Sequence, residues 1–221
     1  MIQPYASRTG TKTTIAAMRV AGWGELVSPV QTYAAPPPLR YVIDNGAWSQ
    51  FQYRLKWLDS REGPPPAAFD RDGFAALVEK WGGAADWTAL PDIVAGGIRS
   101  LAFSLDWLPW VLGHTPVALL PVQDGMDPHH VEHLLGPRVG IFLGGSTEWK
   151  IGTMERWGQL AARTGCHYHV ARVNTADRIR RSQLCGAHSF DGTSVTLFAK
   201  TLGPLDGCRR QSTMFAVGGP R

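Results

Sequence analysis

The sequence predicts an α/β protein in which residues 1–221 form a single domain with the fold of a compact (β/α)8 TIM barrel. Eight short apolar segments have the length and pattern of strands, and amphipathic helical segments connect most of them. This alternation implies parallel strands joined by right-handed crossovers. Eight units favour a closed barrel over an open doubly wound sheet, since no GxGxxG motif follows the first strand.

The first 81 residues are predicted to contain three strands and two helices. Ile15, Met18 and Ala21 recur at helical spacing and would share one face of the first helix. Proline-rich segments at 34–38 and 63–66 are incompatible with regular structure, so both are expected to be surface loops. The predicted strands span 3–8, 25–28 and 39–43, and the predicted helices span 11–21 and 69–81.

From residue 87 onward the alternation of strands and helices is regular. Pro109 lies inside an otherwise helical pattern, so it is expected to kink or end that helix. The predicted strands span 87–90, 116–122, 139–143, 166–173 and 188–191. The predicted helices span 98–112, 128–135, 153–163, 176–185 and 195–201.

The composition is that of a globular protein, with 44% apolar and 18% charged residues. The chain has no run of about 18 apolar residues, so no membrane span is expected. It also has no basic segment followed by an apolar one at its start, so no secretory signal is expected. Cys166, Cys185 and Cys208 are widely spaced and without a CxxC motif. They therefore fit reduced thiols in a cytoplasmic protein, and neither a metal nor a cofactor is expected.

Polar residues or glycines follow the C-terminal ends of five predicted strands. The carboxyl ends of barrel strands meet at one mouth, where TIM barrels carry their active sites. A strand-end glycine lets a flat ligand approach the backbone, and an Asp with a Gln suits the amide edge of a purine. The residues that form this candidate site are Asp44, Asp92, Gln123, Gly144, Gly145 and Asp191.

Two of these carboxylates suit substitution at the anomeric carbon of a sugar, where one attacks and the other moves protons. Each carboxylate taken alone also has a simpler explanation. Asp44 precedes Asn45-Gly46 and Asp191 precedes Gly192, both typical of turns, and Asp92 has the position of a helix N-cap. The hypothesis of an active site therefore depends on the carboxylates meeting in the folded chain.

Aromatic and basic residues extend the candidate site. Trp48 and Trp149 follow strand ends and could stack on a base or pack in the core. The net charge of +4 is compatible with a polyanionic partner. The basic residues that could contact phosphates, or equally form a solvated surface, are Lys150, Arg172, Arg178, Arg180, Arg181, Arg209 and Arg210.

Three histidines, His129, His130 and His133, have a spacing that metal ligands also show. They fall on a short helix that is predicted to be exposed, and no catalytic partner accompanies them. A solvated position is therefore the favoured interpretation, and a metal site is the alternative.

Five short motifs occur in a characteristic order: YVIDNGAW at 41–48, PDIV at 91–94, VQDG at 122–125, IFLGG at 141–145 and SFD at 189–191. In this order and spacing they resemble the tRNA-guanine transglycosylase superfamily, over most of the chain up to about residue 201. The similarity is greatest to the compact, phage-type branch, the DNA-guanine transglycosylases that insert 7-deazaguanine bases.

The resemblance implies a role for each matching residue. Asp191 matches the aspartate that attacks C1′ and holds the sugar covalently, and Asp44 matches the general acid/base. Asp92 and Gln123 match the residues that recognise the purine. The pair Gly144–Gly145 matches the diglycine whose backbone contacts the base.

The resemblance also implies the function, which is replacement of guanine in DNA by a 7-deazaguanine such as 7-cyano-7-deazaguanine. Such an enzyme would work in the cytoplasm, in that of the host if a phage encodes it, and a homodimer is one expected state. Two departures bear on the substrate. Only Cys208 lies where members that act on tRNA carry a zinc site of three cysteines and a histidine, and 146–150 replaces a fuller glycine motif. The first departure favours DNA over tRNA, and the second leaves the incoming base open.

Three alternatives stay open at this point. The chain could be a tRNA-guanine transglycosylase, or a hydrolytic N-glycosylase in which water takes the place of the incoming base. It could also be a non-catalytic nucleic-acid-binding partner subunit, although the presence of both Asp44 and Asp191 argues against that.

Overall fold

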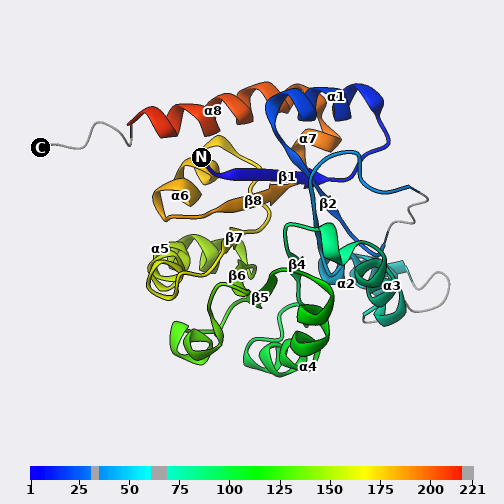
Figure 1. Ribbon diagram of the computed structural model, residues 1–221, viewed down its shortest axis with the longest axis vertical. Coiled ribbons are helices and arrows are strands. Elements are labelled where there is room, and N and C mark those ends of the chain that lie inside the picture. Colours follow the sequence, from blue (N-terminus) through cyan, green and yellow to red (C-terminus); the bar gives the residue numbers. More distant parts are fainter. Residues whose placement is uncertain (31–34, 61–68, 216–221) are drawn as a thin grey trace, which may run out of the picture.

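Eight parallel strands pair in the order of the sequence, and the last strand pairs back with the first, which closes the sheet into a barrel (Figure 1). The computed structural model describes residues 1–30, 35–60 and 69–215. The predicted (β/α)8 TIM-barrel fold is thereby confirmed. The strands are β1 Gln3–Ser7, β2 Gly24–Val27, β3 Tyr41–Ile43, β4 Thr88–Ala89, β5 Ala118–Val122, β6 Val139–Leu143, β7 Tyr168–Val170 and β8 Ser189–Gly192.

Helices surround the strands on all sides in Figure 1. The α-helices are α1 Lys12–Ala21, α2 Ala47–Ser60, α3 Arg71–Trp81, α4 Ile98–His114, α5 Thr147–Thr164, α6 Ala176–Leu184, α7 Ser194–Leu197 and α8 Leu202–Phe215. Short 3-10 helices are η1 Gly82–Ala84, η2 Pro128–His130, η3 Glu132–Leu134 and η4 Ala199–Thr201. The connection between β5 and β6 contains only η2 and η3.

Local chemistry begins and ends the helices where the sequence supplies the right residue. The Asp70 carboxylate accepts from the backbone N–H of Gly73 at the start of α3. Ser146 and Thr175 cap α5 and α6 in the same way. Gly22 follows α1 at φ 75° and Gly165 follows α5 at φ 65°, a left-handed conformation that favours glycine.

Two apolar layers fill the molecule. The larger layer lies between strands and helices and includes Phe74 and Trp157. The smaller layer lies inside the barrel around Tyr5 and Trp87, whose rings meet edge to face with their centroids 5.8 Å apart. The strands alternate between the two layers, because successive strand residues point to opposite faces of the sheet.

Several elements differ from the sequence predictions. Helix α2 was not predicted, because Tyr53, Leu55 and Leu58 are exposed and blur its amphipathic pattern. Helix α8 was not predicted either, because two glycines and Pro204 interrupt its sequence. The predicted helix at 128–135 is instead the two turns η2 and η3.

Two helix boundaries were also wrong. Helix α4 continues through Pro109 to His114, because burial of Trp107 and Val111 on its inner face outweighs the lost backbone bond. Helix α5 begins at Thr147 rather than at 153, directly after its Ser146 cap.

The proline-rich segments are only partly described. The segment 63–66 lies outside the described residues, as does residue 34. Residues 35–38 have no helix or strand, as predicted, and the carbonyls of Ala35 and Pro38 accept hydrogen bonds from Arg8 and Arg19.

We expect Gly158→Ala to destabilise the protein by about 1–3 kcal/mol, the usual range for overpacking a core. A Cβ at this position in α5 would overlap the backbone oxygen of Cys185, which cannot move independently of its chain. Urea denaturation measures the effect.

Gly152→Ala is the matched control in the same helix, since a Cβ there meets no atom within 4 Å. It should stabilise the protein by up to about 1 kcal/mol through helix propensity. Equal effects of the two substitutions would contradict the close contact between α5 and the end of α6.

Candidate active site

A cavity of about 480 Å³ opens at the carboxyl ends of the strands, where TIM-barrel active sites lie. Barrel closure brings Asp44 and Asp191 to one cavity, although they are 147 residues apart in sequence. Trp48 and Arg172 also line the cavity. The predicted site residues that line it are Asp44, Asp92, Gln123, Gly144, Gly145 and Asp191.

Asp191 is 8% exposed, and one of its two carboxylate oxygens is held firmly. Its Oδ1 accepts from Nε2 of His169 at 2.9 Å and from the backbone N–H of Arg172 at 3.2 Å. No hydrogen bond from the described part of the chain reaches Oδ2. One oxygen of this carboxylate is therefore anchored, and the other is available to a ligand in the cavity.

Asp44 directly follows β3, and its Oδ2 accepts from the backbone N–H of Gly46 at 3.1 Å. Burial raises the pKa of its carboxyl to about 7, and the nearby charges of Asp191 and Asp92 act in the same direction. A carboxyl with this pKa can give or take a proton near neutrality, as a general acid or base must.

Asp92 and Gln123 form one hydrogen-bonded group at the side of the cavity. Gln123 Nε2 donates to Asp92 Oδ2 at 3.3 Å and to the Ile93 carbonyl at 3.0 Å. Asn45 Nδ2 donates to Asp92 Oδ1 at 2.9 Å and to the Leu90 carbonyl at 2.6 Å. Burial raises the pKa of Asp92 to about 6, and the bond from Asn45 opposes this shift. The result is a rigid edge of donors and acceptors.

Asn45 is the residue of this group that the sequence analysis missed. It belongs to an Asn-Gly pair, which is typical of a turn, and its own Oδ1 does accept from the Ala47 N–H as turn residues do. Its long-range contacts with Leu90 and Asp92 distinguish it from an ordinary turn residue.

A close approach requires glycine at the second position of the diglycine, Gly145. Gly145 has φ 74°, and a Cβ there would lie 2.6 Å from Asp124 Oδ2 and 2.7 Å from the ring of Trp149. Asp124 in turn accepts from the N–H of Ser146 at 2.6 Å and from its hydroxyl at 2.5 Å. The chain at Gly144 and Gly145 therefore runs along the cavity with no side chain of its own.

Arg172 covers part of the cavity rather than pointing away from it. Its guanidinium lies 4.2 Å from the ring centroid of Trp48 and donates to the Gly145 carbonyl. Its backbone has φ 57°, and its N–H is one of the two donors to Asp191. Arg172 and Trp48 thus form one wall of the cavity, so neither is a simple surface residue.

Lys150 does not lie where a phosphate contact requires. Its side chain is 2% exposed, and its ammonium donates to the backbone carbonyl of Ala171. Burial lowers the pKa of this amine to about 7, and the nearby charge of Arg172 adds to the effect. The prediction that Lys150 contacts a nucleic-acid backbone is therefore wrong, and the residue instead holds the turn that presents Arg172.

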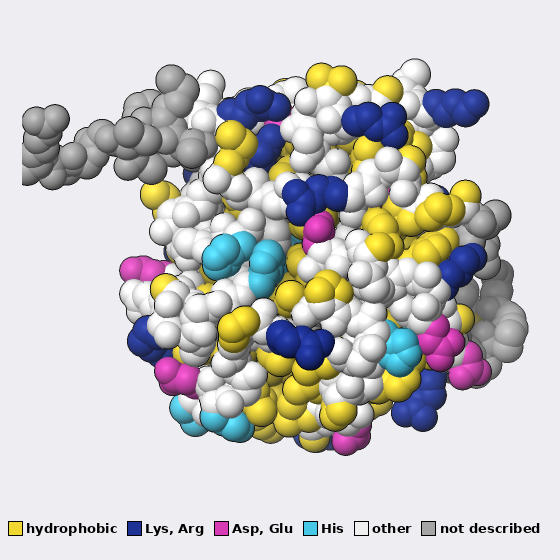
Figure 2. Space-filling model, viewed as in Figure 1, with side chains coloured by type: hydrophobic (Ala, Val, Ile, Leu, Met, Phe, Trp, Pro, Cys, Tyr) yellow, Lys and Arg dark blue, Asp and Glu magenta, His cyan; other side chains and the backbone are white. Residues whose placement is uncertain are grey.

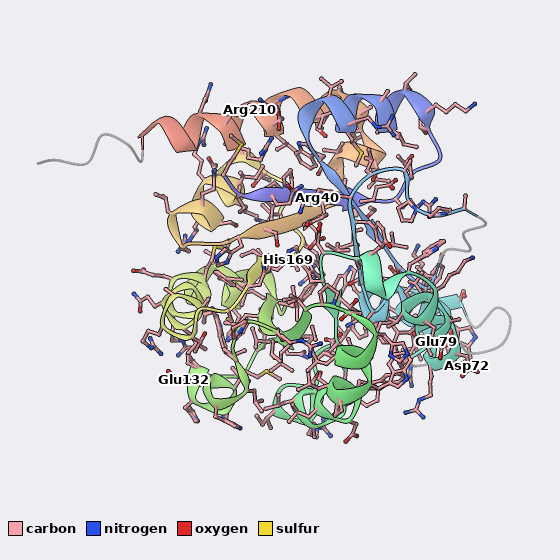
Figure 3. The ribbon with its side chains drawn as sticks, viewed as in Figure 1. Arg40, Asp72, Glu79, Glu132, His169 and Arg210 are labelled. Atoms are coloured by element: carbon pink, nitrogen blue, oxygen red, sulfur yellow. The ribbon has the colours of Figure 1, made fainter. Side chains whose placement is uncertain are left out.

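The other predicted phosphate contacts divide into two groups. Arg178 is half-buried in the first turn of α6, whereas Arg180 and Arg181 are exposed farther along it, and Arg180 pairs with Asp177 at 2.7 Å. Arg209 and Arg210, the latter labelled in Figure 3, both pair with Asp206 in α8.

Arg209 is also 6% exposed and donates to the carbonyl of Ile2, so it ties α8 to the barrel. It is not available to a nucleic acid. Trp149 is half-buried and belongs to the core packing around Trp157, at a centroid distance of 6.2 Å, and it does not line the cavity.

His129 and His130 make local contacts, and His133 is exposed. His130 Nδ1 accepts from the backbone N–H of Asp127, and the His129 ring lies 4.0 Å from that of His130. Within the described ranges, no group of three or more His, Cys, Asp or Glu side chains is arranged to hold a metal ion.

No described helix has the length and apolar character needed to cross a membrane.

Neither a known family model nor a curated protein matches this chain in sequence. Evidence for a function therefore comes from the geometry of the cavity.

We expect Asp44→Asn to stabilise the protein at pH values above its folded pKa. The folded pKa of Asp44 lies above the value of about 4 in an unfolded chain, so ionisation opposes folding. The pH-dependent difference in the free energy of unfolding between variant and wild type should be absent below about pH 4. It should grow up to about pH 7, to a few kcal/mol at most.

Urea denaturation across this pH range measures the difference. Asp106→Asn, at an exposed position in α4, is the control and should show no such growth with pH. A constant difference for Asp44→Asn would mean that its carboxyl is not buried among like charges.

Proposed function

We propose that this chain is a guanine transglycosylase that replaces guanine in DNA by a 7-deazaguanine through a covalent bond between Asp191 and C1′ of the sugar. The observation that supports the proposal is the meeting of Asp191, Asp44 and the Asp92–Gln123 edge in one cavity. Each of these residues alone has a simpler explanation, but their convergence does not.

The cavity has the features that purine binding needs. Gln123 and Asp92 present amide and carboxyl atoms on one rigid edge, which suits the donor and acceptor pattern of guanine. The backbone at Gly144 and Gly145 can approach the plane of a base, and Trp48 offers a ring face. A target nucleotide in a duplex would have to be flipped out of the stack to enter.

The chemistry follows as a double displacement. In the first step an Asp191 oxygen bonds to C1′ while the bond from C1′ to the guanine nitrogen breaks, and its electron pair leaves with the base. Asp44 gives its proton to that departing base. In the second step a ring nitrogen of the incoming base bonds to C1′, its proton passes to Asp44, and Asp191 leaves as a carboxylate. Two inversions retain the configuration at C1′.

The structure of the C-terminal region supports DNA over tRNA as the substrate. Residues 202–215 form α8 against α1 and α6, and the thiol of Cys208 is buried and donates to the Ala176 carbonyl. Cys208 is therefore not placed to serve as a ligand in a zinc site of the kind that the tRNA-acting branch carries. Product analysis distinguishes a hydrolytic glycosylase, which would leave an abasic site.

We expect the wild-type protein to exchange radiolabelled guanine into duplex DNA and Asp191→Asn to lose all exchange. The amide is a far weaker nucleophile than a carboxylate, and no other group holds its place. Unmodified tRNA is assayed in parallel. Labelling of tRNA alone would overturn the choice of DNA, and full exchange by Asp191→Asn would overturn the nucleophile.

We expect kcat/KM for guanine release to fall about tenfold per pH unit above pH 7, because Asp44 must be protonated to serve as the acid. The assay is run from about pH 5 to about pH 9. Asp44→Asn should retain only slow release without this descending limb. If Asp44→Asn weakened only the binding of DNA and left the rate of the chemical step unchanged, this would count against the acid/base role.

A further inference from the structure

A line of hydrogen-bonded side chains runs from Asp191 through the interior of the barrel. His169 Nε2 lies 2.9 Å from Asp191 Oδ1, and His169 Nδ1 lies 2.8 Å from Ser189 Oγ. Ser189 Oγ lies 2.7 Å from Nε2 of His167. His169 and Ser189 are fully buried. TIM-barrel interiors are usually filled by branched apolar side chains, so this line needs an explanation.

Neighbouring strands place these residues in register. β7 and β8 are parallel, and His169 lies opposite Ser189. Because strand side chains alternate, His167 and His169 of one strand face the same side as Ser189 and Asp191 of the other. Figure 3 labels His169 near the middle of the barrel, and the histidine side chains visible on the surface in Figure 2 are other residues, because His169 is fully buried.

Both histidines are neutral near pH 7. Burial lowers the pKa of His169, although Asp191 opposes this shift, and burial lowers the pKa of His167 to about 3. The other ionisable groups that act on them are Lys150 at His169, and His188 and Asp86 at His167. A neutral imidazole has one donor nitrogen and one acceptor nitrogen, so the line has a direction.

That direction can be worked out from Asp191. A carboxylate only accepts, so Nε2 of His169 carries the proton and Nδ1 accepts. The Ser189 hydroxyl must then donate to Nδ1, and its oxygen accepts from Nε2–H of His167. Each donor along the line thus points toward Asp191, which sets the Nε2–H tautomer of His169, and the Ser189 hydroxyl supports this tautomer by donating to Nδ1.

Aromatic rings hold the His169 ring in its plane. The Phe142 ring stacks on it at a centroid distance of 5.0 Å and an interplanar angle of 23°. The Trp87 ring lies 4.5 Å away on a tilted plane. The direction of the N–H toward Oδ1 of Asp191 is therefore fixed by packing as well as by hydrogen bonds.

We propose that His169 is a positioning residue that binds Oδ1 of Asp191, with Ser189 and His167 supporting it through Nδ1, so that Oδ2 is the atom that bonds to C1′. The inference rests on the proposed transglycosylase function. In the covalent intermediate Oδ1 becomes the carbonyl oxygen of the ester and keeps the His169 donor. When the incoming base breaks the bond from C1′ to Oδ2, negative charge returns to the carboxylate, and the same N–H stabilises it.

Three variants test the proposal in the guanine-exchange assay. His169→Phe keeps a ring but removes the donor and should lower kcat about 10- to 100-fold with little change in KM, the equivalent of one hydrogen bond to a charged group. His169→Gln can place an N–H near Oδ1 and should recover most of this loss. Ser189→Ala should lower kcat to a lesser extent, because Nδ1 of His169 loses its donor while Asp191 still holds the Nε2–H group.

The matched control is His133→Gln at an exposed position, which should leave kcat unchanged. Circular dichroism and urea denaturation of each variant separate a folding defect from a positioning defect. If the wild type exchanges guanine and His169→Phe matches its kcat, or if His169→Gln is as slow as His169→Phe, the positioning role is overturned.

A second measurement does not depend on activity. Nitrogen NMR of protein labelled with ¹⁵N-histidine should show His169 as the Nε2–H tautomer in the wild type, and the Nδ1 resonance should shift in Ser189→Ala, where this nitrogen loses its donor. A wild type with Nδ1–H or mixed tautomers would overturn the positioning role whatever the activity. Absence of exchange into either nucleic acid would overturn the proposed function instead, and the NMR result would still decide how Asp191 is held.

Discussion

The pairing of β8 with β1 is the constraint on which the rest of the structure depends. It closes the barrel, and its register sets Tyr5 opposite Asp191. The same closure is reinforced from outside, where Arg209 of α8 pairs with Asp206 and donates to the carbonyls of Ile2 and Ala21. Without this closure, β8 would be an edge strand of an open sheet, and four strands would separate its carboxylate from the one at the end of β3.

Closure of the barrel also places like charges close together in the candidate site. Three carboxylates of one sign share a largely buried cavity, and burial raises the pKa of both Asp44 and Asp92. Hydrogen bonds reduce the cost of burying these carboxylates. A backbone N–H donates to Asp44, and two side-chain amides donate to Asp92. The site therefore trades folding stability for groups that can exchange protons near neutral pH.

The interior of the barrel is divided in the same way. One side is filled by apolar and aromatic side chains such as Val42, Leu119 and Trp87. The other side carries the line from Asp191 to His167, in which the Ser189 hydroxyl and both ring nitrogens of His169 have hydrogen-bond partners. Aromatic rings lie against the imidazole of His169, so the polar line is enclosed rather than solvated. A rigid scaffold of this kind can fix the orientation of the Asp191 carboxylate.

The sequence by itself determined the eightfold alternation, the strand ends and the six residues that converge there, because strand period and turn chemistry are local properties. It could not place Lys150, since a charged residue at a helix start is usually exposed and only tertiary packing buries it under Ala171. Helix α8 could not be predicted from the sequence either, because contacts with α1 and α6 stabilise it despite the low helix propensity of its glycines and proline. Tertiary structure alone decided the partners of Asp191, since the register of β7 against β8 brings His169 to it.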